Sequence, residues 1–282
     1  MNELFAIFEK NARRAPSTVA GYSRAWKAFT DHLARAKVKR PEEIKDAHVI
    51  GWQRELIASG LNPSTVRLKL AQASAVFTFL MKFGTIRRRP NPFSASEPIR
   101  RGARKVKYLT PTEAARLLAA AKAHSRDIYL FCLLCCYLGL RRCEALSLRW
   151  DQFDWDEKKV YIAGVKTESS AAYLPFEHFA EELAPYRRVA GYVVAPESAG
   201  GTIRWNYRSQ FKTVAKKAGV IATPHTLRHT AATILIDRGV PLAEVSRFLR
   251  HSDLGTTQIY ADIRGVTCKS IAAAFRLNTE RD

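Results

Sequence analysis

Six residues of four types could together perform chemistry on a phosphodiester. In chain order they are Arg141, Lys166, His225, Arg228, His251 and Tyr260. Two guanidinium groups can hold the non-bridging oxygens of a phosphate as rigid bidentate donors. A tyrosine can form a covalent intermediate, provided that one group accepts its proton and another protonates the leaving 5′ oxygen. His225 and Lys166 are candidates for those two roles, so the set predicts phosphodiester transfer without a metal.

The spacing of these residues is more specific than any one of them, since a lone tyrosine or a His-x-x-Arg motif arises by chance. Arg228 precedes His251 by 23 residues, and Tyr260 follows nine residues later. This order resembles the signature of the tyrosine recombinase (phage integrase) family, which is Arg, Lys, His-x-x-Arg, His or Trp, then Tyr. The segment HTLRHTAATILIDRGVPLAEVSRFLRHSDLGTTQIYAD resembles the family's most distinctive block along its whole length.

The resemblance implies a site-specific DNA recombinase that cleaves and rejoins strands through a 3′-phosphotyrosyl intermediate, with no cofactor and no metal. It also implies a role for each site residue. Arg141 and Arg228 bind the phosphate, and His251 is a second phosphate ligand. Lys166 is the general acid, His225 is the general base, Tyr260 is the nucleophile, and Glu144 is a supporting carboxylate.

One position departs from the family's pattern. A glycine usually precedes the second histidine, whereas this chain has Leu249-Arg250-His251. Arginine lacks the freedom of glycine at positive φ, so the turn could differ here, or Arg250 could add a phosphate contact. Two structural alternatives also stay open: Glu144 could simply pair with a neighbouring arginine on its helix, and His229 is expected to be structural.

The charge of the chain predicts a polyanionic partner. The formal net charge is +20, and basic side chains gain affinity by displacing counterions from phosphates. Residues 1–107 hold 22 Lys and Arg against 8 Asp and Glu, whereas residues 108–282 hold 24 against 18. The alternative is a basic surface that only keeps the protein soluble, and such a surface would not require the charge to be concentrated in the first part of the chain. We therefore expect the partner to be double-stranded DNA that carries a specific recombination site.

The first hundred residues have the pattern of a small four-helix domain. Apolar residues recur at spacings of three and four after Pro16, within residues 42–58 and after Pro63, and a further helix is expected near residues 2–14. The aromatic residues follow this spacing, so we interpret them as core rather than as base-stacking groups. The basic residues expected to bind DNA from the other faces are Arg24, Lys27, Arg67 and Lys69.

Residues 84–107 interrupt the helical pattern with Pro90, Pro92 and Pro98, and they contain a single acid, Glu97. We interpret this basic stretch as a linker that lies against DNA; a solvated linker is the alternative. The DNA contacts expected in it are Arg100, Arg101, Arg104 and Lys105. The resemblance gives the domain boundaries that we expect: 1–98 for a helical core-binding domain, 99–107 for the basic linker and 108–282 for the catalytic domain.

The second domain is expected to be mostly helical with a small antiparallel β-sheet, which makes the fold class mainly α. Thr110, Pro111 and Glu113 form a capping box at its first helix, and Gly139 ends a buried helix that begins near Asp127. KKVYIAGVKTESSAAYLPF predicts two strands joined by a polar turn. Further helices are expected near residue 142 and over residues 177–189, 203–218, 225–238, 241–250 and 268–277.

Neither a membrane span nor a metal site is predicted. No stretch approaches the roughly 20 apolar residues that a membrane helix needs, and the start of the chain lacks the pattern of a cleaved signal peptide. The five cysteines lack the spacing of a zinc site. Cys132, Cys135 and Cys136 fall in an apolar run and are expected to be buried thiols. We therefore expect a cytoplasmic protein without a membrane partner.

The resemblance further implies a C-shaped clamp around DNA and a homotetramer on two paired sites, acting in integration, excision or resolution of DNA elements. The element could be a mobile genetic element, as for a phage, transposon or plasmid enzyme, and a chromosome-dimer resolvase stays open as well. We expect no second class of DNA site, because no further domain precedes the core-binding helices. A type IB topoisomerase that relaxes DNA as a monomer is one alternative. An apolar stripe that a neighbouring subunit could bury, Ile271, Ala274 and Phe275, argues against it. The other alternative is a DNA-binding regulator whose catalytic residues are vestigial.

Overall fold

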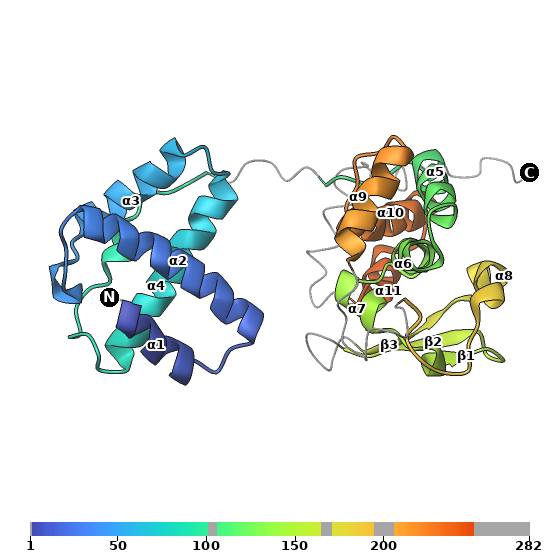
Figure 1. The fold of residues 1–282 in the computed structure, drawn as a ribbon, viewed down its shortest axis with the longest axis horizontal. Coiled ribbons are helices and arrows are strands. Elements are labelled where there is room, and N and C mark those ends of the chain that lie inside the picture. The colour runs from blue at the N-terminus through green and yellow to red at the C-terminus, as the bar shows by residue number, and fades with distance from the viewer. Residues whose placement is uncertain (1, 101–105, 165–170, 195–205, 251–282) are drawn as a thin grey trace, which may run out of the picture. The chain divides into compact units, whose positions relative to one another are not determined.

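The computed structural model describes residues 2–100, 106–164, 171–194 and 206–250. Within these residues the chain is mainly helical with a small antiparallel sheet, which confirms the predicted fold class (Figure 1). The chain divides into two compact units, Met1–Arg104 and Lys105–Asp282. No helix in the described ranges is both long and apolar enough to cross a membrane.

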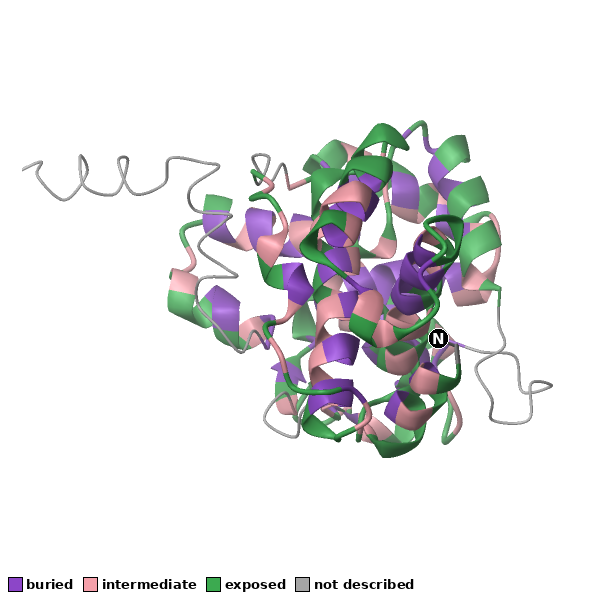
Figure 2. Cartoon of the chain, turned by 90° about the vertical axis from the view of Figure 1, so that its left-hand side faces the viewer, coloured by how far each residue is buried: buried purple, intermediate pink, exposed green. Residues whose placement is uncertain are grey.

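Helices with one apolar face build the N-terminal unit. They are α1 (Asn2–Asn11), α2 (Pro16–Arg35), α3 (Asp46–Ala58) and α4 (Pro63–Lys82). The ring of Phe29 lies 5.0 Å from that of Trp52 and 4.8 Å from that of Phe93, measured between centroids. These rings are buried, and Figure 2 shows the alternation of buried and exposed residues along the helices. The interpretation of the aromatic residues as core is therefore confirmed.

The proline-rich stretch after α4 packs onto this unit, so the prediction of a linker is wrong for residues 84–98. The side chains of Ile86 and Phe93 are buried in the same core. Arg89, which the sequence suggested as part of a DNA-facing linker, donates hydrogen bonds to three carbonyl oxygens. These belong to Pro41, Glu42 and Ile44, at 2.8–2.9 Å. Proline ends a helix because it removes a donor, but it does not prevent the chain from packing.

Helices also dominate the C-terminal unit. They are α5 (Pro111–Lys122), α6 (Arg126–Tyr137), α7 (Arg142–Ser147), α8 (Ala180–Leu183), α9 (Tyr207–Lys217), α10 (Pro224–Asp237) and α11 (Leu242–Phe248). The apolar helix α6 lies at the centre and contacts α5, α7, α9 and α10. A helix that is apolar on every side must be buried on every side. The helix expected over residues 177–189 is instead a run of short helical turns that ends at Tyr186.

Burial of α6 fixes the state of its thiols. Cys132 and Cys135 are fully buried, whereas Cys136 is half-buried. Burial raises the pKa of Cys132 and Cys135, and it raises the pKa of Cys136 to about 11. The prediction of buried thiols is thus confirmed for the first two and holds in part for the third.

Three short strands form the sheet of this unit. They are β1 (Phe153–Asp154), β2 (Lys159–Ile162) and β3 (Ala172–Pro175), in the order β1-β2-β3 with antiparallel pairing. The register sets Tyr161 opposite Tyr173 on the solvent face and Val160 opposite Leu174 on the buried face. The prediction of two paired strands is confirmed, and β1 adds a third.

Local signals determine the helix ends that surround the site. The backbone N–H of Glu113 donates to the Thr110 hydroxyl at 3.2 Å, and the Glu113 carboxylate accepts from the Thr110 backbone at 2.8 Å. The predicted capping box is therefore present at the start of α5. Gly139 follows α6 with φ +56°, a conformation that favours glycine because it has no Cβ.

Candidate active site

The first part of the candidate site lies at the start of α7. Glu144 accepts a hydrogen bond from the Arg141 backbone N–H at 2.7 Å and from the Arg141 guanidinium at 2.8 Å. The first contact satisfies the backbone N–H of Arg141, the residue that caps α7. The carboxylate is 2% exposed, whereas the Arg141 side chain is 35% exposed. Glu144 thus holds Arg141 on the buried side, and the other side of the Arg141 side chain is open to solvent.

Helix α10 contributes Arg228 to the same place. Its Nη1 donates to the carbonyl oxygen of Gly139 at 2.6 Å, and its Nη2 donates to the carbonyl oxygen of Leu249. The same Nη1 lies 3.9 Å from the Glu144 carboxylate. The side chain is 1% exposed. Glu144 therefore lies between the two arginines that the sequence predicts, although Arg228 is covered in this structure.

The chain between α11 and residue 251 completes the cluster with Arg250. This residue has φ +54°, the left-handed conformation that costs about 1–2 kcal/mol for a residue with a Cβ. Its Nη2 donates to Glu144 at 2.7 Å, and its side chain is 2% exposed. The φ value of Arg250 is one that glycine favours, so the arginine adopts a glycine-like backbone conformation. The suggested phosphate contact by Arg250 stays a prediction; in this structure its guanidinium is buried and pairs with Glu144.

Opposing effects set the ionisation of the buried carboxylate. Burial raises the pKa of Glu144, but the charge of Arg250 and the hydrogen bonds from Arg141 and Arg250 outweigh it, so that the pKa lies below its ordinary value. Burial also lowers the pKa of Arg250 against the opposing effect of Glu144. The thiol of Cys135, on α6, is the other titratable group that Glu144 affects. The site is therefore a buried anion surrounded by guanidinium cations.

His225 lies in the first turn of α10, which Thr223 caps by accepting from the Thr226 backbone at 3.2 Å. Its side chain is exposed. The His225 ring lies against the His229 ring, with 4.3 Å between centroids, because residues four apart share one helix face. His225 and Arg228 thus come from one helical turn, one exposed and one buried.

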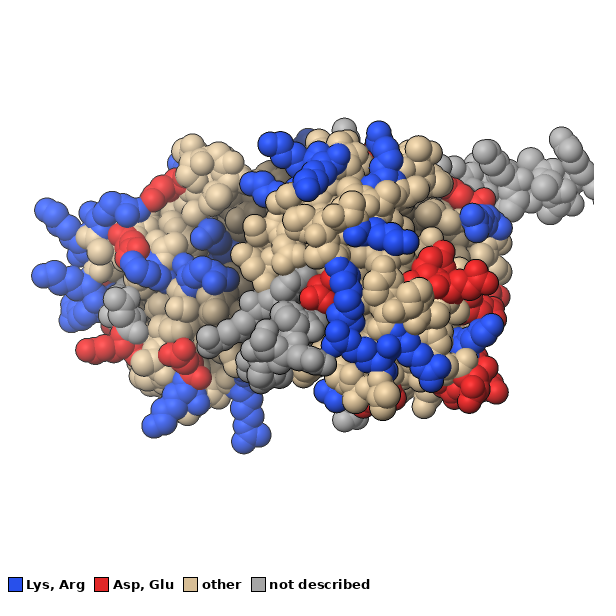
Figure 3. All heavy atoms as spheres, turned by 45° about the vertical axis from the view of Figure 1, so that its right-hand side comes forward, with Lys and Arg blue, Asp and Glu red and all other residues tan. Residues whose placement is uncertain are grey.

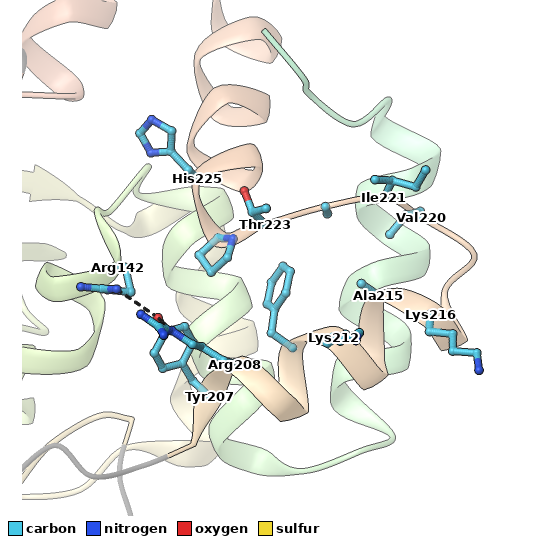
Figure 4. A pocket seen from close by; sticks show the side chains of 13 residues that line it. Arg142, Tyr207, Arg208, Lys212, Ala215, Lys216, Val220, Ile221, Thr223 and His225 are labelled. Atoms are coloured by element: carbon cyan, nitrogen blue, oxygen red, sulfur yellow. Dashed lines mark hydrogen bonds between the residues drawn. The ribbon is translucent and has the colours of Figure 1, made fainter. Parts of the chain in front are cut away.

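A basic and apolar pocket adjoins His225. It has a volume of about 840 Å³ and is lined mainly by α9 and by the segment that leads into α10. Figure 4 shows Arg142, Tyr207 and Arg208 gathered at one end of it, where Arg142 donates to the Tyr207 hydroxyl at 3.2 Å. Along α9, Arg208, Lys212 and Lys216 recur at every fourth position. This basic face was not predicted from the sequence, although its helical spacing was a usable signal.

The basic residues expected to contact DNA in the N-terminal unit lie at its surface. Arg24, Lys27 and Arg100 are exposed, and Arg67 and Lys69 are half-exposed. Lys27 also pairs with Asp31 at 2.8 Å, as expected for residues four apart on a helix. Figure 3 shows Lys and Arg side chains distributed over the visible face of both units. These positions are compatible with phosphate contacts but do not test them.

Several predicted residues lie outside the described part of the chain. They are Lys166, His251 and Tyr260 of the site, Arg101, Arg104 and Lys105 of the basic linker, and the helix expected over residues 268–277. The described part of the site is therefore Arg141, Glu144, His225 and Arg228, together with Arg250.

Comparisons with protein families match both units. The model described as Phage integrase family matches residues 107–265, and the one described as Phage integrase, N-terminal SAM-like domain matches residues 2–84. The tyrosine recombinase XerD of Listeria monocytogenes is 26% identical over an alignment of 293 positions, and the match covers 96% of this chain and 95% of that protein. The tyrosine recombinase XerC of Xanthomonas campestris is 30% identical and covers 72% of this chain and 65% of that protein.

Solved structures share the fold. A lambda integrase dimer bound to a COC′ core site superposes with a TM-score of 0.75 at 19% identity, and the match covers 94% of this chain and 78% of that one. The Tn1549 transposon integrase in complex with transposon right end DNA gives a TM-score of 0.71 at 16% identity, covering 96% and 99%. At these identities the likeness concerns the fold alone.

Proposed function

From the premise that this chain belongs to the phage integrase family and is a site-specific tyrosine recombinase, we propose which residues perform its strand exchange. Tyr260 is the nucleophile, Arg141 and Arg228 bind the scissile phosphate, and the remaining groups move protons or support them. The observation that carries the proposal is the position of Glu144. This one buried carboxylate lies 2.8 Å from Arg141 and 3.9 Å from Arg228, of which the first caps α7 and the second lies in α10.

The proposed reaction is balanced within the protein and DNA. The phenolic oxygen of Tyr260 forms a bond to phosphorus while the bond from phosphorus to the 5′ oxygen breaks. His225 accepts the phenolic proton, and Lys166 donates a proton to the leaving 5′ oxygen. His251 donates a hydrogen bond to the phosphate. A 5′ hydroxyl of the same or a partner strand then reverses the step, so the energy of the broken ester is retained in the protein–DNA bond.

Arg228 must become accessible in this reaction. Its guanidinium is 1% exposed and donates to the carbonyl oxygens of Gly139 and Leu249. We propose that the Arg228 side chain exchanges these two carbonyl contacts for the phosphate when DNA binds. Arg141, which is 35% exposed, and the exposed His225 need no such exchange.

The proposed partner is double-stranded DNA with a specific recombination site, bound by a homotetramer on two paired sites. The net charge of +20 supports a DNA partner, and a lambda integrase tetramer bound to a Holliday junction is among the solved structures with this fold. We assign residues 1–98 to core binding, 99–107 to a basic linker and 108–282 to catalysis. We further propose that the enzyme acts in the cytoplasm on DNA of a mobile genetic element.

A covalent capture experiment tests the nucleophile and finds the site. The protein is incubated with a pool of random-sequence DNA duplexes, denatured, and separated from DNA that is not covalently attached. The recovered duplexes are sequenced and resynthesised. We expect wild-type protein to form an adduct and Tyr260→Phe to bind the recovered duplex with unchanged affinity but form none, because only the hydroxyl is lost. Equal adduct formation by Tyr260→Phe would refute the assignment.

The same duplex separates the two alternatives. A recombinase should relax supercoiled plasmid only when the plasmid carries the recovered site, whereas a type IB topoisomerase would relax plasmid that lacks it. A regulator with vestigial catalytic residues would bind the duplex without any adduct.

A further inference from the structure

Arg250 occupies a position where the family's sequence pattern led us to expect a glycine, and its side chain is directed inward. The backbone has φ +54°, and the guanidinium is 2% exposed. An arginine that bound DNA here would have to present its charge to solvent, which this one does not. The residue therefore keeps the backbone conformation of the glycine and adds a buried cation.

The side chain and the backbone of Arg250 both contact residues of the predicted phosphate-binding site. Its Nη2 donates to Oε2 of Glu144 at 2.7 Å, and its backbone carbonyl oxygen accepts from Nη2 of Arg141 at 2.9 Å. Arg141 in turn donates from Nη1 to Oε1 of Glu144 at 2.8 Å. Arg141, Glu144 and Arg250 thus form a closed ring of three contacts. The ring joins the start of α7 to a residue 106 positions later in the chain than Glu144.

Only some of the remaining N–H groups of the Arg250 side chain have a hydrogen-bond partner. Its Nη1 donates to the Phe248 carbonyl oxygen at 2.9 Å, while its buried Nε has no hydrogen-bond partner among the described residues. An unpaired buried donor is unfavourable. Not every donor of the Arg250 side chain therefore has a partner in this position. Its strongest partner is the Glu144 carboxylate.

A comparison of the contacts of Glu144 Oε2 with and without the Arg250 side chain shows what this side chain adds. Without the arginine, this oxygen would retain the Arg141 backbone N–H at 2.7 Å and the more distant Arg228 guanidinium at 3.9 Å. Arg228 also donates to the Leu249 carbonyl oxygen and Arg141 to that of residue 250, so these contacts restrain the backbone after α11 but leave Oε2 of Glu144 without a cation as near as Arg250. With the arginine, one carboxylate connects the start of α7 to the residue that immediately precedes His251.

We propose that Arg250 is a positioning residue of the recombinase. It holds Glu144, and through Glu144 the guanidinium of Arg141, in the orientation that meets the scissile phosphate. Its side chain also adds a second contact between residue 250 and the start of α7, beside the one that Arg141 makes with the backbone carbonyl there. This inference rests on the proposed function, and it concerns a side chain that a glycine at this position would lack.

The test compares Arg250→Gly and Arg250→Lys with wild type on the duplex recovered by covalent capture. Glycine suits φ +54°, so Arg250→Gly removes the guanidinium without adding backbone strain. We expect unchanged DNA affinity, since the side chain is buried, and a rate of adduct formation lower on the order of 10- to 100-fold. Arg250→Lys keeps one cation near Glu144 and should restore part of the rate. A cleavage rate of Arg250→Gly equal to wild type would overturn the proposal.

A double variant distinguishes positioning from mere structural support. In Glu144→Gln, the guanidiniums of Arg141, Arg228 and Arg250 face one another without an anion. Removing one of them should then help, so Glu144→Gln/Arg250→Gly should cleave faster than Glu144→Gln alone. If the two losses simply multiply, the pair does not act as a unit and the proposal fails.

The pH profile of stability gives a second independent readout. The charged or titratable groups that face Glu144 are Arg141, Arg228, Arg250 and the Cys135 thiol. Loss of the Arg250 charge raises the pKa of Glu144, so the decrease in the free energy of unfolding on acidification should begin at higher pH in Arg250→Gly than in wild type or Arg250→Lys. An unmoved profile in Arg250→Gly contradicts the proposal.

Failure of this inference and failure of the proposed function give different results. If wild-type protein forms no adduct on any duplex, both are wrong. If wild type forms the adduct, Tyr260→Phe does not, and Arg250→Gly behaves as wild type, only the role of Arg250 is wrong.

Discussion

The guanidinium of Arg228 donates a 2.6 Å hydrogen bond to the carbonyl oxygen of Gly139, a residue 89 positions earlier in the chain. Gly139 has φ +56°, and a Cβ built on it would lie 2.6 Å from Cδ2 of the fully buried Leu249. Leu249 is the residue whose carbonyl oxygen accepts the other hydrogen bond of Arg228. The turn after α6 therefore fixes Arg228 only if it carries a glycine.

Gly139→Ala should consequently destabilise the fold. The left-handed conformation and the overlap with Leu249 together should lower the free energy of unfolding by about 2–5 kcal/mol. The matched control is Gly219→Ala, where φ is +65° but nothing lies within 4 Å of the added Cβ, and the expected loss is about 1–2 kcal/mol. Urea unfolding of both variants measures the difference, and equal losses would show that the contact with Leu249 is unimportant.

Glu144→Gln should lower the free energy of unfolding in a pH-dependent way. The folded pKa of Glu144 lies below its ordinary value of 4.5, so the ionised carboxylate stabilises the fold above that value. This contribution disappears as the pH falls through the lower folded pKa. At neutral pH we expect a loss of roughly 3–5 kcal/mol, because buried guanidiniums lose their anion, and the loss should shrink in acid.

The control for that experiment is Glu113→Gln. The pKa of Glu113 is also lowered, by hydrogen bonds from the Thr110 backbone and hydroxyl, but its side chain is only half-buried. Its substitution should therefore cost far less at neutral pH. A Glu144→Gln loss that stays constant from neutral to acidic pH would show that the carboxylate is not ionised in the fold.

Lys166→Ala tests the proposed general acid. Protonation of the leaving 5′ oxygen should contribute roughly 10²–10⁴-fold to the cleavage rate. A substrate whose scissile 5′ bridging oxygen is replaced by sulfur needs no acid, because a thiolate leaves without a proton. We expect Lys166→Ala to fail on ordinary DNA and to cleave the sulfur substrate at nearly the wild-type rate. If Lys166 only binds phosphate, both substrates will suffer alike.

The basic linker is tested by the salt dependence of DNA binding. Replacing Arg100, Arg101, Arg104 and Lys105 together by alanine removes up to four phosphate contacts. The slope of log affinity against log salt should flatten by up to about four units, and each single substitution should account for about 0.9. Fluorescence anisotropy on the recovered duplex at several salt concentrations measures the slope, and an unchanged slope means that the linker does not touch the DNA backbone.

Residues close together in the chain made much of the fold predictable. The capping box of Thr110 and Glu113, the largely apolar α6 and the alternating strands around residues 159–175 each depend on neighbours a few positions apart. The order of site residues was likewise readable, because a chemical set with fixed spacing can be recognised without coordinates. The basic face of α9 was readable too, from its repeat of every fourth residue.

Contacts between distant residues were decided only by the tertiary structure. Arg89 belongs to a run of three arginines in the sequence, yet it donates to the carbonyl oxygens of Pro41, Glu42 and Ile44. Arg250 occupies a position where glycine was expected, and whether its charge reached solvent or the interior depended on Glu144, 106 residues earlier. A sequence gives the type and order of charges, but the partner that an arginine finds depends on which carboxylate or carbonyl the folded chain brings within hydrogen-bonding distance.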